Sequence, residues 1–150
     1  MLEKTFGVKL AGVTYRDRVG AYGVVFRAKN QVAAIRTSRG FFLPGGGIEG
    51  DETHEECIVR ESLEEAGLAV AVMEFIGKGE TYHRWSDRLR YHMHGIGYFY
   101  HARLIEIVAV VTEADHELVW LDIAECVQNL FPEHQRWAVE QATLQRAAWQ

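Results

Sequence analysis

The sequence has few of the features that mark an exported or membrane-bound chain. It contains 2 cysteines and 2 prolines, and its first residues, MLEKTFGVKLAGV, lack a basic head followed by an unbroken apolar run. Two cysteines exclude a disulfide framework, and the N-terminal pattern is not that of a signal peptide. No apolar run approaches the roughly 18 residues of a membrane span. We therefore expect a cytoplasmic protein with no membrane partner.

Basic residues are too few to bind a nucleic-acid backbone. The chain has 16 Lys and Arg against 21 Asp and Glu, a net charge of −5, whereas such binding needs a basic excess. Apolar residues make up 48% and charged residues 25%, a globular balance that argues against disorder. The length fits a single domain over residues 1–150. A small anionic substrate remains compatible with this charge if a bound cation supplies the positive charge.

The order of expected elements predicts a mixed sheet with helices packed on it. Strands are expected at about 3–14, 19–28, 31–37, 40–43, 68–76, 90–104 and 118–121, with a break at Pro44 and the glycines after it. Helices are expected at about 53–66, 122–130 and 132–148. Thr53 with Glu56 forms a capping box, Asp122 with Glu125 forms a second, and Gly67 ends the first helix.

The expected helix at 53–66 is rich in acidic residues. On a wheel of about 100° per residue, the side expected to face the sheet carries Val59, Ser62, Leu63 and Ala66. The opposite side carries Cys57, Glu61, Glu64 and Glu65. Acidic neighbours at this spacing repel one another. The wheel leaves two interpretations open: a solvated acidic face partly neutralised by Arg60, or carboxylates that hold a divalent cation such as Mg²⁺.

The residues around this helix form a longer pattern. In full it is Gly46-x5-Glu52-x7-Arg60-Glu61-Ser62-x-Glu64-Glu65-x-Gly67-Leu68. The pattern resembles the Nudix box of the Nudix (MutT-like) hydrolases, with every invariant-type position filled. Seven fixed positions match by chance on the order of once in 10⁸ starts. Ser62 stands where the box usually has an aliphatic residue or alanine, a departure that we expect to alter packing only.

The resemblance implies an α/β fold, the α/β/α sandwich of the family, with a mixed curved sheet and a loop–helix–loop catalytic motif. It implies that the metal ligands are Glu61, Glu64, Glu65 and the backbone carbonyl of Gly45. Arg60 is expected to orient carboxylates by ion pairing, with Glu52 as its partner. The implied cofactor is Mg²⁺, with Mn²⁺ as a substitute.

The implied reaction is metal-dependent hydrolysis of a diphosphate. A diphosphate repels an anionic nucleophile, so a cation must neutralise its oxygens and activate a water. One carboxylate then accepts the proton of that water. Glu61 is the first candidate for this base. Glu117, in the segment HELVWL, is the second, with Glu113 behind it.

Glycines and aromatic residues supply the candidate substrate contacts. The run Gly45-Gly46-Gly47 is interpreted as a tight loop that brings backbone close to metal and phosphate, with Gly46 at the substrate. Bases stack on aromatic rings, so Tyr82, Trp85 and Tyr91 are expected near the substrate, as is His83.

Other notable side chains have simpler explanations. His92 and His94 share a strand face, but the wet face of a strand explains them better than zinc. Cys57 is interpreted as a packing residue. Trp137 is interpreted as a core anchor of the last helix.

The leading function is cleavage of a small-molecule nucleotide, either a nucleoside diphosphate derivative or a nucleoside triphosphate. With Pro44 and Pro132 as the only prolines, the chain lacks the downstream proline associated with ADP-ribose hydrolases. The alternative is a non-catalytic Nudix-like module that binds a nucleotide or a protein, and the retained box glutamates favour the enzyme. No sequence pattern indicates an oligomeric state.

Overall fold

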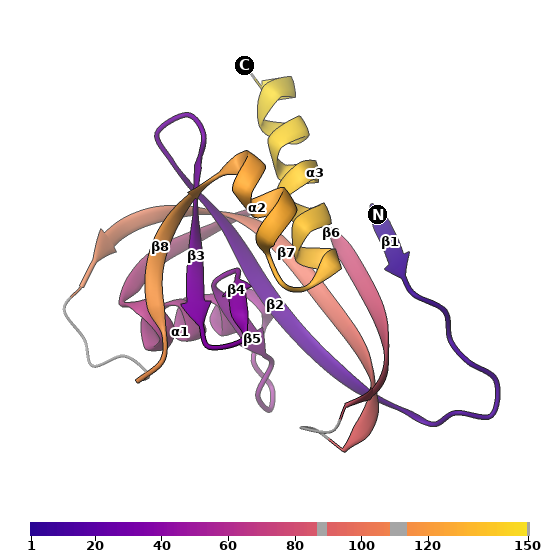
Figure 1. Ribbon diagram of the computed structural model, residues 1–150. Coiled ribbons are helices and arrows are strands. Elements are labelled where there is room, and N and C mark those ends of the chain that lie inside the picture. The colour runs from indigo at the N-terminus through magenta and orange to yellow at the C-terminus, as the bar shows by residue number, and fades with distance from the viewer. Residues whose placement is uncertain (87–89, 109–113, 150) are drawn as a thin grey trace.

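The computed structural model describes residues 1–86, 90–108 and 114–149, with residues 84–86 described by their backbone alone. The strands are β1 (Glu3–Phe6), β2 (Tyr15–Arg27), β3 (Gln31–Thr37), β4 (Gly40–Phe42), β5 (Gly45–Gly47), β6 (Leu68–Ser86), β7 (Tyr91–Ile107) and β8 (Glu117–Asp122). The helices are α1 (His54–Ala66), α2 (Ile123–Asn129) and α3 (Glu133–Trp149). In Figure 1, α1 lies behind the sheet, and α2 and α3 lie in front of it.

The strands form one mixed sheet. Their order is β1-β6-β7-β2-β3-β4, with β5 paired to β2 and β8 paired to β3. The β6–β7 pair is antiparallel, whereas β1–β6 and β2–β7 are parallel. Register shifts interrupt the β6–β7 pair, and such bulges bend and twist a sheet. The expected α/β/α sandwich with a mixed curved sheet is confirmed.

A separate apolar core fills each side of the sheet, because side chains alternate along each strand. Ala21 and Val25 of β2 point towards α1, and Val24 between them points towards α2 and α3. Trp137 of α3 is 8% exposed and belongs to the second core. Its expected role as a core anchor is confirmed.

Three strands differ from the expectation. The first ends at Phe6 rather than near residue 14, because Gly7 adopts a left-handed conformation with φ 83°. β6 continues through Ser86 rather than ending near Ile76. The glycine run that was read as a break is the short strand β5, which pairs with Gly20–Tyr22 of β2. The longer β6 carries its backbone well beyond the expected end. The new strand β5 lies against the acidic helix α1.

The ends of α1 are as predicted. The Thr53 side chain accepts a hydrogen bond from the Glu56 backbone N–H, and the Glu56 carboxylate accepts one from the Thr53 N–H. Gly67 closes the helix in the left-handed conformation with φ 64°. None of the helices in the described ranges is long and apolar enough to cross a membrane.

Candidate functional site

Helix α1 packs on the sheet through a different side from the one the wheel predicted. Its buried residues are Cys57, Ile58, Ser62, Glu65 and Ala66. Val59 and Leu63, which were expected to face the sheet, are 38% and 39% exposed. Ser62, expected at the edge of the core, is fully buried. The buried arc is therefore displaced by roughly a quarter turn from the prediction.

The displacement has a physical cause in β5. The wheel assumed that the most apolar side of the helix is buried, but α1 also packs against the backbone of β5, which offers polar partners. The Cys57 thiol donates to the Gly46 carbonyl at 3.3 Å. The Glu65 carboxylate accepts from the Gly45 N–H at 3.0 Å. Cys57 is thus a packing residue, as predicted, and burial raises its thiol pKa to about 11.

The glycines of β5 make this close approach possible. At Gly45, where φ is 142°, a Cβ would lie 2.2 Å from the Ala21 carbonyl oxygen. At Gly46 a Cβ would lie 2.7 Å from the carboxyl carbon of Glu61. The expected tight loop is instead a strand, and its approach to a metal and a phosphate stays a prediction.

Arg60 is the centre of the charged part of the site. Its guanidinium lies 2.5 Å from Glu52, 3.0 Å from Glu61 and 3.2 Å from Glu64. It also donates to the Gly47 carbonyl at 3.3 Å and lies 3.8 Å from Glu49. The expected pairing of Arg60 with Glu52 is confirmed.

The Arg60–Glu52 contact fixes the charge state of both groups. Hydrogen bonding from Arg60 lowers the pKa of the Glu52 carboxyl to about 2. The same contact raises the pKa of the guanidinium above its already high ordinary value. One cation thus faces several carboxylates, which leaves the cluster with excess negative charge.

Glu65 approaches the strand that follows the later loop. Its carboxylate is 8% exposed, and Oε2 lies 4.0 Å from Nδ1 of His116, the residue before β8. The predicted Glu117 is engaged elsewhere, in an ion pair with Arg36 of β3 at 2.5 Å. Successive residues of an extended segment point to opposite faces. Glu117 therefore points away from the face on which His116 approaches Glu65.

The donor set suits a hard divalent cation. Carboxylate oxygens are the ligands that Mg²⁺ prefers, and the excess negative charge favours a cation here. In the described ranges, however, no group of three or more His, Cys, Asp or Glu side chains is already gathered around one point. Glu61 and Glu64 are turned towards Arg60.

The predicted aromatic contacts lie further along the sheet. Tyr82 stacks on His94 with ring centres 4.3 Å apart, and Arg16 lies 4.7 Å from the Tyr91 ring. Across the paired strands, Lys78 of β6 is level with Gly46 of the box. Tyr82 lies four residues further along β6 than Lys78, which is roughly 13 Å along the strand. The side chain of Trp85 and all of Glu113 lie outside the described residues. Substrate contact by these residues stays a prediction.

His94 has a structural role in the described fold. Both ring nitrogens of His94 lie 2.9 Å from carboxylate oxygens, those of Asp17 on β2 and Glu80 on β6. His94 therefore links three neighbouring strands, with its side chain 14% exposed. His94 is thus a mostly buried link between strands rather than part of the wet strand face that was expected, and both of its nitrogens are already within hydrogen-bonding distance of carboxylates.

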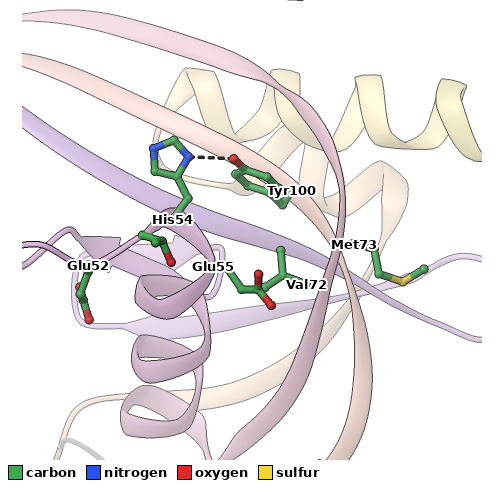
Figure 2. Close-up of a pocket in the computed structure, with 7 residues that line it drawn as sticks. Glu52, His54, Glu55, Val72, Met73 and Tyr100 are labelled. Atoms are coloured by element: carbon green, nitrogen blue, oxygen red, sulfur yellow. Dashed lines mark hydrogen bonds between the residues drawn. The ribbon is translucent and has the colours of Figure 1, made fainter.

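A cavity of about 550 Å³ opens at the N-terminal end of α1. Figure 2 shows His54 and Tyr100 meeting across it, where His54 Nδ1 lies 2.8 Å from the Tyr100 hydroxyl. Met73 and Val72 form its apolar side. Glu52 lines this cavity and also pairs with Arg60, so the cavity adjoins the charged cluster.

One known protein domain matches most of this chain. The profile of the NUDIX domain matches residues 16–141. The chain belongs to the NUDIX domain family. This confirms the resemblance read from the box, and the match extends over both faces of the sandwich, from β2 into α3.

Individual NUDIX relatives match over shorter segments. "Nudix hydrolase 21, chloroplastic" of Arabidopsis thaliana is 43% identical over 47 residues, 31% of this chain and 24% of the relative. A "MutT-like protein" of Streptomyces ambofaciens is 43% identical over 61 residues, 39% of this chain and 40% of the relative. Such matches span about a quarter to two fifths of the curated relatives.

Solved structures establish the fold. A NUDIX hydrolase from Nitrosomonas europaea superposes with a TM-score of 0.69 at 15% identity, covering 85% of this chain and 88% of that one. The NUDIX fold therefore persists at an identity where few side chains are shared.

Proposed function

We propose that this NUDIX protein hydrolyses the diphosphate linkage of a nucleoside diphosphate derivative or a nucleoside triphosphate, with Mg²⁺ as cofactor and Mn²⁺ as a substitute. The observation that carries the proposal is the placement of two box carboxylates on a glycine backbone. Glu65 accepts the Gly45 N–H, and Glu61 lies where a side chain at Gly46 would be. A solvated acidic face would need neither contact.

The cation would be held by Glu61, Glu64, Glu65 and the Gly45 carbonyl. Bound there, it would neutralise phosphate oxygens and lower the pKa of a coordinated water. Glu61 is the first candidate to accept the proton of the attacking water, because its side chain is only 17% exposed and rests on β5. Glu117 is the second candidate.

Arg60 and the glycines position these groups. Arg60 binds Glu52 through two nitrogens and Glu61 through a third, which limits the rotation of the Glu61 carboxylate. Gly46 has no side chain, so the Glu61 carboxylate can lie directly on its backbone, and the proposed contact of Gly46 with the substrate is through that backbone. The expected substrate is a small nucleotide rather than a nucleic-acid polymer, because the chain carries a net charge of −5.

The first experiment is a panel of substrates incubated with and without Mg²⁺. Two solved proteins that share the fold are named a UDP-X diphosphatase and an ADP-ribose pyrophosphatase, so nucleotide sugars and ADP-ribose belong in the panel beside the nucleoside triphosphates. We expect Mg²⁺-dependent product from at least one compound. If no compound is cleaved with Mg²⁺ or Mn²⁺, the binding-module alternative is favoured instead.

The second experiment replaces Glu65 by glutamine. The amide oxygen can still accept the Gly45 N–H, so the fold should persist, while the loss of charge should reduce turnover at least ~100-fold. Glu140→Gln, on the exposed side of α3, is the matched control and should be fully active. Near-normal turnover of Glu65→Gln would show that the site is assigned wrongly. Glu61→Gln and Glu117→Gln, compared at saturating Mg²⁺, separate the two candidate bases.

A further inference from the structure

A second cavity, of about 260 Å³, lies between the sheet and the C-terminal end of α3. Its walls include side chains from β2, β6, β7 and α3, namely Phe26, Glu74, His101, Arg103, Arg146 and Trp149. Phe26 belongs to the core on the α3 side of the sheet, opposite α1. In Figure 1 the C-terminal end of α3 is at the top, whereas α1 is at the lower left. The cavity is therefore separate from the acidic site.

Polar contacts fix the last turns of α3 to the sheet beside this cavity. The amide nitrogen of Gln145 donates to the Ile76 carbonyl at 3.3 Å, and the amide oxygen lies 2.7 Å from Nε2 of His101. Arg146 donates to the Lys29 carbonyl at 3.3 Å. The walls are thus held in place without a ligand, which reduces the entropy lost on binding.

The same contacts determine which nitrogen of His101 carries the proton. Because the Gln145 nitrogen faces the Ile76 carbonyl, the Gln145 oxygen faces His101, and Nε2 of His101 must be the donor. The ring is 5% exposed, and this burial lowers its pKa, which favours the neutral form. Nδ1 is then an acceptor, and it has no hydrogen-bond partner within the described ranges. It is not among the fully buried unpaired atoms of those ranges, so a ligand in the cavity can reach it.

Two arginines give the cavity a positive charge. Arg103 makes no hydrogen bond or ion pair in the part of the chain that the structure describes. Arg146 lies 3.7 Å from the centre of the Phe26 ring, and its bond to a carbonyl uses one of five N–H donors. Glu74 is the single carboxylate among the described lining residues, so the cations are in excess. An anionic group is therefore favoured here.

Trp149 supplies an aromatic surface that the fold leaves open. Its side chain is 57% exposed, although its ring lies 4.7 Å from that of His101. A ligand ring that covered the indole would remove this apolar surface from water. The cavity is slightly smaller than the roughly 300–1,000 Å³ of pockets for drug-sized ligands, so one ring system with a short substituent fits it.

We propose that this cavity binds a small planar heteroaromatic anion. Arg103 and Arg146 bind its anionic group, and Trp149 stacks on its ring. A ring N–H donates to Nδ1 of His101. This binding site does not depend on the proposed function, because it uses neither the box residues nor their cation.

The first probe is indole-3-carboxylate, which combines one fused ring system, one N–H and one carboxylate. Two matched compounds each lack one of these groups: indole has no carboxylate, and in 1-benzothiophene-3-carboxylate sulfur replaces the N–H. ¹H–¹⁵N NMR of the labelled protein follows the side-chain N–H of Trp149, identified as the signal that Trp149→Phe lacks. We expect a saturable shift with indole-3-carboxylate and roughly 10-fold weaker binding of the other two compounds.

Arg103→Gln tests the site from the side of the protein. The residue is exposed and forms no ion pair within the described ranges, so the variant should stay folded. It should bind indole-3-carboxylate about 10-fold more weakly, whereas its affinity for uncharged indole should not change. Lys4→Gln makes the same change of charge on the exposed β1, away from the cavity, and should bind as wild-type protein does.

Three results would each overturn the proposal. The first is the absence of any shift of the Trp149 signal at millimolar indole-3-carboxylate. The second is equal binding of all three compounds, which would mean apolar adsorption without recognition of the charge or the N–H. The third is equal affinity of Arg103→Gln and Lys4→Gln for indole-3-carboxylate. Metal-dependent turnover is measured separately and bears on the proposed function alone.

Discussion

The Glu65 carboxylate accepts a hydrogen bond from the backbone N–H of Gly45 at 3.0 Å, twenty residues earlier in the chain. This contact joins α1 to β5 and helps to explain why an acidic residue of the helix is 8% exposed. A buried carboxylate needs a donor or a cation to offset its lost hydration. The N–H of Gly45 supplies part of that compensation.

The three glycines of β5 should tolerate alanine to different degrees. Gly45→Ala would place Cβ 2.2 Å from the Ala21 backbone oxygen, in a left-handed conformation, and should cost about 3 kcal/mol or more. Gly46→Ala meets the movable Glu61 side chain, so we expect a loss of about 1 kcal/mol but a large loss of turnover. Chemical denaturation and turnover assays measure the two effects.

Gly47→Ala is the internal control of this series. Apart from its chain neighbours, no atom of the described residues lies within 4 Å of the position its Cβ would take, so stability should change by less than about 0.5 kcal/mol. Equal losses at all three positions would mean that backbone flexibility, rather than close approach, is the reason for the glycines.

The Arg60–Glu52 pair should act as a unit in catalysis. Arg60→Lys removes the forked contact, and we expect kcat/KM to fall about 10- to 100-fold, as for other supports of a metal site. Glu52→Gln should cause a similar fall, and the double variant should be little worse than either. Additive losses would show that the two residues act separately.

The same pair has a defined pH window. Because the pKa of Glu52 is lowered to about 2 from an ordinary value of 4.5, its contribution to stability is complete above about pH 4.5. It declines as pH falls through that value and is lost near pH 2. Denaturation of wild-type protein and Glu52→Gln should therefore converge towards pH 2.

Local patterns predicted the box and the caps of α1 because each depends on a few neighbouring residues, whereas the sandwich was implied by the resemblance of the box to a known family. Thr53 needs only Glu56 to close its capping box, and Gly67 needs only its own backbone freedom. The orientation of α1 could not be predicted in this way. It depends on β5, whose backbone donates a hydrogen bond to Glu65 and accepts one from Cys57.

His116 shows a second limit. Its proximity to Glu65 joins residues that are 51 positions apart in the chain, and depends on the pairing of β8 with β3. The box pattern names Glu61, Glu64 and Glu65 but contains no information about that strand. Alternation along β8 distinguishes His116 from Glu117 only once the strand has been placed.

The corrected orientation of α1 makes a direct prediction about stability. Ile58 is fully buried, so Ile58→Ala should cost about 2–4 kcal/mol. Leu63 is 39% exposed, so Leu63→Ala should cost less than about 1 kcal/mol. Urea denaturation of the two variants tests this. Equal losses of unfolding free energy in the two variants would contradict this orientation of α1 and favour the one that the wheel predicted.

His134, near the start of α3, should make the fold sensitive to mild acid. Its side chain packs edge-on against Phe99 with ring centres 5.2 Å apart and is 7% exposed. Nδ1 has no hydrogen-bond partner within the described part of the chain. Burial, with a smaller contribution from nearby His83, lowers the pKa of His134 to about 4 from an ordinary value of 6.5.

Unfolding exposes the imidazole, which then takes up a proton at any pH below about 6.5. The stability that depends on neutral His134 is thus complete above that pH and is lost progressively down to about pH 4. The full loss is at most roughly 3 kcal/mol. In His134→Gln the side chain cannot titrate, so the decline of unfolding free energy between pH 6.5 and 4 should be shallower than in wild-type protein. Parallel declines would mean that other groups, such as the buried His101, determine the acid sensitivity.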